Sequence, residues 1–300
     1  MCRTQWATMA SAVAAGLLMA GMAACSDSSN PSGATTLTVS ETNDIGDAIA
    51  DEVDQAVGSI TTEGAAFSVA GSQAAAAFFA PPGGCATVDN TTDTDADGAP
   101  DDATFTFAPP ACRFVGFRGG TLEITGTINI SDPTPVSADF SYLATLTDFQ
   151  FKLTSPNATR TFTATRNGTR ALSGNAAGVS LSNTLTLVRS APSRTDATIS
   201  HDLLLNFTPA TGQVLALGQP LPSGTFTKSG TFTWSRDNLT RTFTVSTVTP
   251  LAWDATCTTD RKIVSGEIRA TLADGGYIKT VWSGCGADPT RTFVKAVPTA

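Results

Sequence analysis

A ten-residue acidic stretch, residues 93–102, carries the pattern in this chain that most clearly predicts chemistry. Its first carboxylates occupy positions 1, 3 and 5 of a loop, where side chains converge on one cation because the chain curls around it. A glycine at position 6 allows a sharp turn, position 7 can offer a backbone carbonyl, and position 9 is again acidic. We therefore expect a structural calcium site with the ligands Asp93, Asp95, Asp97, Ala99 and Asp101.

The stretch resembles the D-x-D-x-D-G loops of EF-hands, dockerins and thrombospondin type 3 repeats. This resemblance implies Ca²⁺ as the ion, with an affinity of about 0.1–1 mM, as in extracellular modules. It fails at position 12, where Thr104 replaces the bidentate Glu, and Phe105 and Phe107 predict a strand where an EF-hand has a helix. The acids of the stretch would repel one another without a counterion. The alternative is a solvated acidic loop held by a disulfide.

The sequence lacks the common catalytic motifs. His201 is the only histidine, which excludes zinc proteases of the H-E-x-x-H type, and its strand parity with Ile199 and Leu203 predicts a hydrogen-bonded core position. Neither a G-x-S-x-G elbow nor an S-x-x-K motif occurs. We therefore expect no enzyme. A hydrolase that uses paired carboxylates, as in glycoside hydrolysis, is the alternative.

The first 24 residues have the organisation of an export signal. Arg3 gives a positive start, residues 7–24 carry no charge, and small residues end the segment. Met22-Ala23-Ala24-Cys25 then resembles the lipobox of bacterial lipoproteins, with Met where Leu is commoner. In that family the cysteine receives a diacylglyceryl group, and after cleavage its amine is usually acylated, for example with palmitate. The resemblance makes Cys25 the lipidation site; an ordinary signal peptide or an uncleaved membrane helix is the alternative.

A polar linker follows the expected anchor. Residues 25–40 are predicted to be a flexible tether, because small polar and turn-forming residues fill positions 26–33. Several acyl chains on one cysteine would make membrane residence stable. Ser26 follows the cysteine, which by resemblance to enterobacterial sorting implies the outer membrane of a Gram-negative bacterium.

Four of the six cysteines remain once Cys2 leaves with the leader and Cys25 is lipidated. An even number in an oxidising compartment predicts two disulfides. We favour Cys85–Cys112 and Cys257–Cys285 over the two other pairings, because each of these pairs brackets a short hairpin-like segment. Each crosslink would stabilise the fold by about 3–4 kcal/mol in the chain-entropy model. A four-cysteine metal site is disfavoured, because no C-x-x-C spacing exists.

Residues 43–60 predict an amphipathic helix. Apolar side chains recur there at three- and four-residue steps, at Ile45, Ile49, Val53, Val57 and Ile60. Asn43 or Asp44 is expected to cap its start, and acids crowd its first turns, as the helix dipole favours.

From residue 103 onward the apolar period changes to two, which is typical of half-buried antiparallel strands. Residues 122–130 and 179–187 alternate aliphatic with small polar side chains, and turn signals such as Asn167-Gly168 separate the runs. About 10 to 12 strands are expected. The predicted fold class is all-β with one N-terminal helix: a mainly antiparallel meander, built as a sandwich or as an open or closed barrel. Residues 41–300 are expected to form this single domain.

One change of parity interrupts the pattern. Phe140 and Tyr142 lie on one parity, whereas Phe149 and Phe151 lie on the other. A bulge near Leu146 would bring all of them to the same face of a sheet.

Charge and architecture bound the function. The formal net charge of −8 argues against nucleic acid, which requires basic patches. One helix ahead of many strands also resembles the half-barrel carriers of lipoproteins and lipids, and the whole chain resembles uncharacterised bacterial lipoproteins with an acidic loop between two cysteines. Our leading hypothesis is a non-catalytic, membrane-anchored envelope domain with a binding or structural role. Its partner would be a protein or an apolar small molecule; an apolar cavity of roughly several hundred Å³ would favour the carrier.

Overall fold

The computed structural model describes residues 37–50, 85–90, 92–97, 99–110, 112–115, 120–155, 160–190, 195–216, 219–259 and 262–296. The expected leader, Cys25 and most of the expected tether therefore lie outside the described residues, as does the expected helix from residue 51 onward. Gly98 of the acidic stretch is also outside them.

Thirteen antiparallel strands form one sheet in the described residues. They are β1 (Thr87–Val88), β2 (Asp102–Phe107), β3 (Arg113–Val115), β4 (Thr121–Ser131), β5 (Tyr142–Thr154), β6 (Thr161–Asn175), β7 (Gly178–Ser190), β8 (Ala197–Pro209), β9 (Gly224–Arg236), β10 (Leu239–Trp253), β11 (Ile263–Thr271), β12 (Tyr277–Trp282) and β13 (Thr290–Val294). Each strand pairs with its sequence neighbour, except that β2 and β3 both pair with β4. The predicted meander is confirmed, with slightly more strands than expected.

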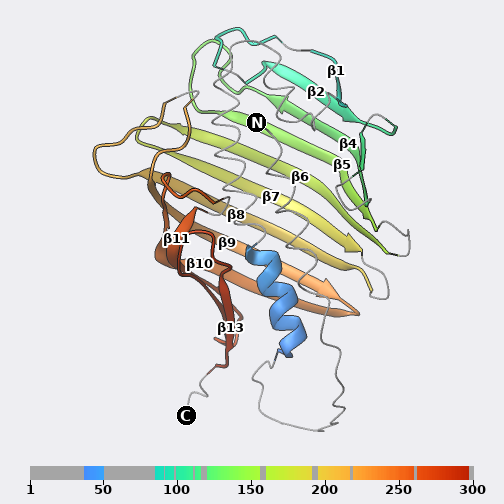
Figure 1. Ribbon diagram of the computed structural model, residues 1–300, viewed down its shortest axis with the longest axis vertical. Coiled ribbons are helices and arrows are strands. Elements are labelled where there is room, and N and C mark those ends of the chain that lie inside the picture. Colours follow the sequence, from blue (N-terminus) through green and yellow to red (C-terminus); the bar gives the residue numbers. More distant parts are fainter. Residues whose placement is uncertain are drawn as a thin grey trace.

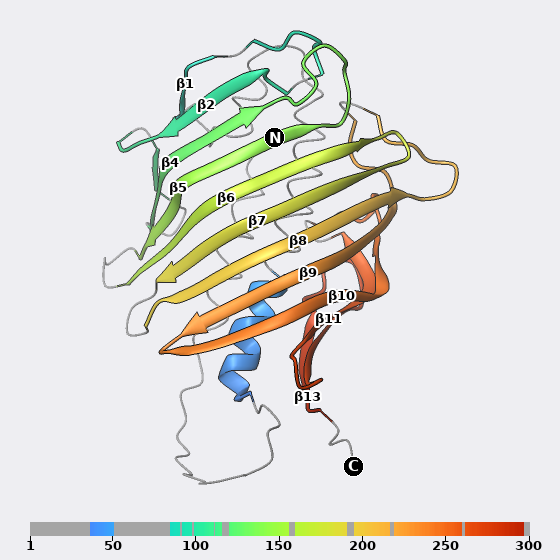
Figure 2. The same cartoon turned by 180° about the vertical axis from the view of Figure 1, so that it is seen from behind.

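The sheet is unclosed, with β1 and β13 at the two ends of the strand order. Figures 1 and 2 show β4 to β9 as a broad twisted layer, from which β10 to β13 turn away. The helix lies on the side toward which they turn. Of the expected arrangements, the described strands therefore adopt an open and curved single sheet.

Period-two sequences explain why one face of this sheet is buried. In β9, Phe226, Phe232 and Trp234 are buried, while Thr225 and Thr227 on either side of Phe226 are exposed. The same alternation fills β7 and β8, where buried aliphatic residues alternate with largely exposed polar ones. The hydroxyl-rich face meets water, and the apolar face forms the core, as the sequence pattern predicts.

The expected bulge lies in β5. The pairing of β5 with β6 shifts between Leu146 and Phe149, and Asp148 has a positive φ of 47°. The Asn167 side chain holds this kink by accepting a hydrogen bond from the Asp148 amide at 2.6 Å. On the other side, Gly126 adopts a φ of 104° where a Cβ would clash with the Asp148 carbonyl. The bulge lets Leu146 and Phe149 both face the core.

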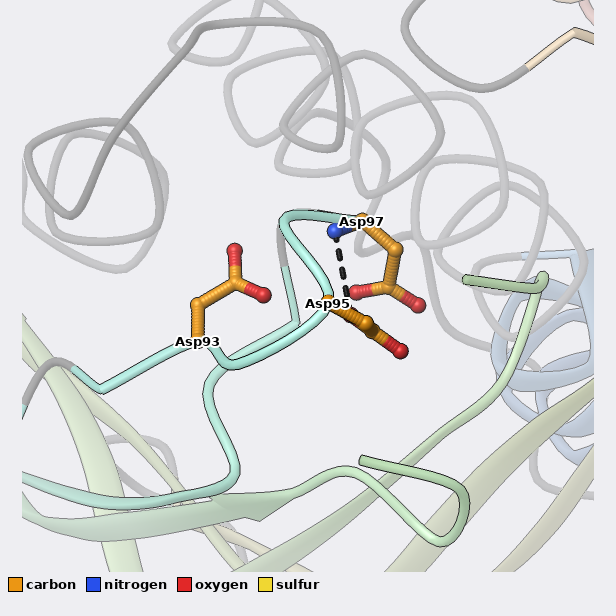
Figure 3. Close-up of side chains that lie close together, drawn as sticks. All are labelled: Asp93, Asp95 and Asp97. Atoms are coloured by element: carbon orange, nitrogen blue, oxygen red, sulfur yellow. Dashed lines mark hydrogen bonds between the residues drawn. The ribbon is translucent and has the colours of Figure 1, made fainter. Parts of the chain in front are cut away.

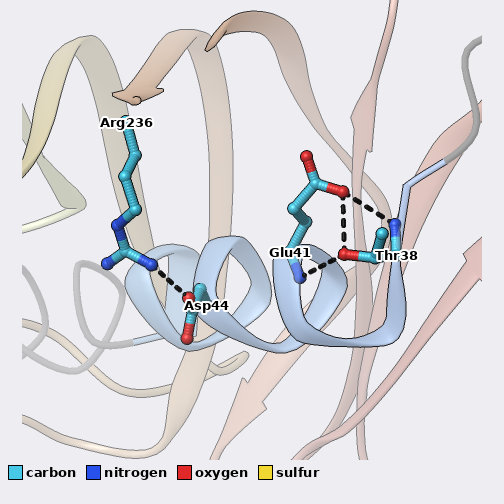
Figure 4. A network of polar contacts seen from close by, with 4 residues as sticks. All are labelled: Thr38, Glu41, Asp44 and Arg236. Carbon is cyan, nitrogen blue, oxygen red and sulfur yellow. Dashed lines mark hydrogen bonds and ion pairs between the residues drawn. The ribbon is translucent and has the colours of Figure 1, made fainter. Parts of the chain in front are cut away.

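The helix begins earlier than predicted. It is described over residues 39–50, so the expected start at residue 43 and the expected cap at Asn43 or Asp44 are wrong. Thr38 is the cap: its hydroxyl accepts a hydrogen bond from the Glu41 amide at 3.2 Å, and the Glu41 carboxylate accepts one from the Thr38 amide at 2.8 Å (Figure 4). This is a capping box. The last residues of the expected tether, 39 and 40, are therefore helical.

Two ion pairs tie the helix to distant strands. Asp44 pairs with Arg236 at the end of β9 at 2.5 Å (Figure 4), and Asp47 pairs with Arg291 in β13 at 3.1 Å. Ile45 and Ile49, on the predicted apolar face, are 0% and 1% exposed. The helix therefore bridges the curved sheet from β9 to its last strand.

Both favoured disulfides are present. Cys85 and Cys112 have Cα atoms 4.9 Å apart, and Cys257 and Cys285 have Cα atoms 5.9 Å apart. The first pair brackets β1, the acidic loop and β2, and the second brackets the hairpin of β11 and β12. Each covalent loop therefore encloses a pair of strands, as expected.

Candidate metal centre

The acidic stretch forms the loop between β1 and β2, at one end of the strand order. Its base is closed by hydrogen bonds, because the Thr104 amide donates to the Asp89 carboxylate at 2.7 Å and the Asp101 amide donates to the Thr92 carbonyl at 2.8 Å. These contacts, together with the neighbouring disulfide, fix the two ends of the acidic loop.

Three of the predicted ligands come together on this loop. Asp93, Asp95 and Asp97 each offer a carboxylate oxygen, and these oxygens lie within 4.8 Å of one another. Figure 3 shows the three side chains on one curl of the loop, where the Asp97 amide donates to the Asp95 carboxylate at 3.2 Å. The spacing of positions 1, 3 and 5 therefore produces the expected convergence, and this arrangement suits an oxygen-coordinated cation.

The two remaining predicted ligands have other contacts. Both Asp101 carboxylate oxygens accept hydrogen bonds from Thr94, one from its amide at 2.9 Å and one from its hydroxyl at 2.6 Å. These bonds lower the pKa of Asp101 and direct it to loop closure. Ala99 is 2% exposed, and its amide donates to the Asp97 carboxylate at 2.8 Å. In the described residues, Asp101 does not join the carboxylate cluster.

A second acidic triad was missed by the sequence reasoning. Asp97 also lies within 4.8 Å, oxygen to oxygen, of Asp132 and Asp139, which belong to the loop between β4 and β5. The register brings the two loops together, because Asp102 at the start of β2 lies opposite Ser131 at the end of β4. The available signal was a pair of acids beside the Asp132-Pro133 turn.

Backbone hydrogen bonds dock the two loops. The Asp132 amide lies 3.1 Å from the Pro100 carbonyl and 3.2 Å from the Asp101 carbonyl, and it donates to both. The Asp139 amide donates to the Asp97 carboxylate at 3.3 Å. The acidic side chains of the two loops are thereby held against one another.

Burial makes these carboxylates costly to ionise. Asp97 is 1% exposed, and burial, aided by the nearby charges of Asp95 and Asp132, raises its pKa to about 6. Burial also raises the pKa of Asp132, with Asp95 and Asp139 adding repulsion. Among the described residues, no Lys or Arg forms an ion pair with Asp95, Asp97, Asp132 or Asp139. A bound cation would supply the missing positive charge.

The buried face of the sheet also carries polar side chains. His201 in β8 is 4% exposed and lies opposite Leu185 and Phe232, so it faces the core as its parity predicts. Lys228 in β9 is 3% exposed, and Asn183 in β7 accepts a hydrogen bond from Arg170 at 3.2 Å. The sequence analysis did not single out Lys228, Asn183 or Arg170, although the strand parity that they share with buried apolar neighbours could have identified them.

A pocket of about 160 Å³ lies where the helix meets the sheet. Its lining mixes the charged residues Asp44, Asp47 and Arg236 with apolar residues such as Ile199 and Trp234. Trp234 is 3% exposed and belongs to the core. This pocket is smaller and more polar than the apolar cavity of several hundred Å³ that would favour a carrier.

No helix in the described part of the chain is long and apolar enough to cross a bilayer. Comparison with models of protein families, with curated proteins and with solved structures found no match.

Proposed function

We propose that this protein is a non-catalytic lipoprotein of the bacterial cell envelope whose β domain contains a structural calcium site. The observation that supports the calcium site best is the convergence of Asp93, Asp95 and Asp97, with Asp97 fully buried and lacking a cationic side-chain partner among the described residues. Oxygen ligands on an irregular loop suit Ca²⁺, which accepts six to eight oxygens in flexible geometry.

The proposed role of the ion is to hold the loop rather than to perform chemistry. The loop is fastened by the Cys85–Cys112 disulfide and by its contacts with the β4–β5 loop, so a cation would complete an already fixed frame. Of the five aspartates in the two triads, Asp97 and Asp132 are less than 10% exposed. This burial keeps them away from a substrate in solution. These features support a structural ion and a role without catalysis.

Calcium binding is tested by thermal unfolding of the full-length protein in detergent, with Ca²⁺, with Mg²⁺ and with a chelator. If Ca²⁺ is present at ten times the dissociation constant, we expect about 1.4 kcal/mol of stabilisation. This corresponds to a rise of roughly 3 °C in Tm, and Mg²⁺ should give less, because it demands a stricter octahedron. Asp93→Asn with Asp95→Asn should reduce the rise, because it removes two of the proposed ligands.

The matched control is Asp237→Asn, which removes an exposed acid from the β9–β10 turn, far from the cluster in strand order. This variant should keep the full calcium response. An unchanged Tm in Ca²⁺ for the parent protein would contradict the proposed site, as would an equal loss of the response in Asp237→Asn.

The proposed anchor rests on the lipobox-like sequence Met22-Ala23-Ala24-Cys25. Mass spectrometry of the protein purified from its native host should find a mature chain that starts at acylated Cys25. Cys25→Ala should abolish lipidation and the processing that depends on it. A native chain that begins at Met1, or one with a free thiol at position 25, would overturn the anchor while leaving the calcium proposal intact.

A further inference from the structure

We infer that Asp97, Asp132 and Asp139 form a second cation subsite, so that the centre holds two Ca²⁺ ions that share Asp97. This inference rests on the proposed calcium site and extends it to a loop that lacks a calcium-binding sequence pattern. Asp132 and Asp139 follow β4, some thirty to forty residues beyond the acidic loop.

The first observation is the geometry of two triads joined at one residue. The oxygens offered by Asp93, Asp95 and Asp97 lie within 4.8 Å of one another, and so do those offered by Asp97, Asp132 and Asp139. A carboxylate has two oxygens and about four lone-pair directions, so one aspartate can contact two cations. Asp97 is the residue at which both triads meet.

The second observation is independent of the clustering. Asp132 is 6% exposed, and its Oδ1 accepts a hydrogen bond from the Thr134 amide at 2.8 Å. Its Oδ2 is buried and has no hydrogen-bond partner among the described residues. Asp139 repeats this pattern: Oδ2 accepts from the Thr134 hydroxyl at 2.6 Å, whereas its buried Oδ1 has no such partner there.

A carboxylate that binds a metal ion needs this arrangement, in which one oxygen is held by a hydrogen bond and the other can coordinate the ion. Thr134 donates a hydrogen bond to one oxygen of Asp132 and to one oxygen of Asp139. The other oxygen of each carboxylate can then bind a cation. A buried carboxylate oxygen without a hydrogen-bond partner destabilises the fold, and it does so more strongly when it is charged. On the other loop, Asp95 shows the same arrangement, with Oδ1 bonded to the Asp97 amide and Oδ2 buried without a described partner.

Charge favours two ions over one. The two triads contain five carboxylates, which carry five negative charges when ionised. One Ca²⁺ would leave three of these charges uncompensated in a site where Asp97 and Asp132 are only 1% and 6% exposed. Two Ca²⁺ ions would leave one, which water and backbone donors can accommodate.

The second ion would join the β1–β2 loop to the β4–β5 loop. Three described hydrogen bonds already link them: the Asp132 amide donates to two backbone carbonyls, and the Asp139 amide donates to the Asp97 carboxylate. Ions shared between the loops would therefore fasten residues 132–141 to the disulfide-bracketed segment and stiffen this end of the sheet.

The stoichiometry of calcium binding tests the inference. Equilibrium dialysis of the full-length protein in detergent against radioactive Ca²⁺ should give two ions per chain. Asp132→Asn with Asp139→Asn should reduce the count to one and leave the remaining dissociation constant within about tenfold of its parent value. Asp93→Asn with Asp95→Asn should also leave one ion, and Asp237→Asn should keep two.

Asparagine retains a carbonyl oxygen that can accept the Thr134 hydrogen bonds, and circular dichroism of each variant verifies that the sheet is formed. One ion in the parent protein, retained in the Asp132 and Asp139 variant, would overturn the second subsite and leave the proposed function standing. One ion that either double variant removes would indicate a single shared site and would overturn the inference too. No bound ion in the parent would overturn both proposals.

Discussion

Asp97 is the residue that both triads share, and among the described residues it is also the carboxylate with the most strongly raised pKa. Two hydrogen bonds from described residues reach it, from the Ala99 amide at 2.8 Å and from the Asp139 amide at 3.3 Å, and both favour its charged form. Burial outweighs them and raises the pKa to about 6. The fold therefore holds this carboxylate in a place where its charge is unfavourable, a cost that the proposed cation would offset.

The stability of the calcium-free protein should consequently fall as pH rises. Between the ordinary pKa of 3.8 and the folded value of about 6, the folded chain retains a proton on Asp97 that the unfolded chain has lost. The free energy of unfolding therefore declines across this window and stays low above it. Urea unfolding in chelator at pH 4.5 and pH 7.5 measures the effect.

In the same experiment Asp97→Asn should flatten this part of the pH dependence and add about 1–2 kcal/mol at pH 7.5 without calcium, because one pKa unit corresponds to about 1.4 kcal/mol and one hydrogen bond is weakened. Asp237→Asn should leave the slope unchanged. If the Asp97→Asn protein is less stable than its parent at pH 7.5 and keeps the same pH dependence, the charge of Asp97 is not what destabilises the fold.

Sequence alone could identify three of the five aspartates in the two triads. Asp93, Asp95 and Asp97 follow one another at a fixed spacing, so a single loop reveals them. Asp132 and Asp139 reach the same point only through the register of β2 against β4, which places the start of one strand beside the end of the other. Contacts set by strand register cannot be read from local spacing.

At the level of elements, the helix start shows how a local signal was overlooked. Thr38 and Glu41 have the spacing of a capping box, but Thr38 falls in the segment that was predicted to be a tether, and Glu41 directly follows that segment. The apolar stripe of Ile45 and Ile49 was identified correctly, because it depends on periodicity rather than on the boundary. Strands were predicted better than the helix end for the same reason.

The capping box predicts the effect of changing Thr38. Thr38→Ala should lower the free energy of unfolding by about 1 kcal/mol, since it removes the oxygen that accepts the Glu41 amide. Thr38→Ser keeps that oxygen, and its free energy of unfolding should stay within a few tenths of a kcal/mol of the parent value. Urea titrations would compare the two variants, and equal stability of Thr38→Ala and Thr38→Ser would argue against the cap.

The two disulfides should differ in their link to calcium. Each closes a loop of similar length, with sequence separations of 27 and 28, so removing either should cost about 3–4 kcal/mol. Only the Cys85–Cys112 bond brackets the acidic loop. Replacing both its cysteines by Ser should weaken calcium binding, whereas the Cys257 and Cys285 double variant should bind as tightly as the parent.

Unfolding curves and calcium titrations of both double variants measure these effects. Equal calcium affinity in the two variants would mean that the loop keeps its shape without its covalent bracket.

At the level of the whole molecule, the meander localises the effect of any ion. Each strand of the sheet pairs with strands close in sequence, and both triads lie near the end of the strand order that begins with β1. Calcium should therefore slow amide hydrogen exchange in the β1–β2 and β4–β5 loops and leave β10 to β13 unchanged. Central strands β6 to β9 should exchange slowest in either condition, and uniform protection across the sheet would contradict a local role.

The ion pair between Asp44 and Arg236 joins residues 192 positions apart. Ribosomes add about 5–20 residues per second, so the helix is complete roughly 10 to 40 s before its partner on β9 has been made. Asp44 lacks its Arg236 partner during that interval, and Arg291, the partner of Asp47, is made later still. The earliest described element in synthesis is thus among the last to gain its ion-pair partners.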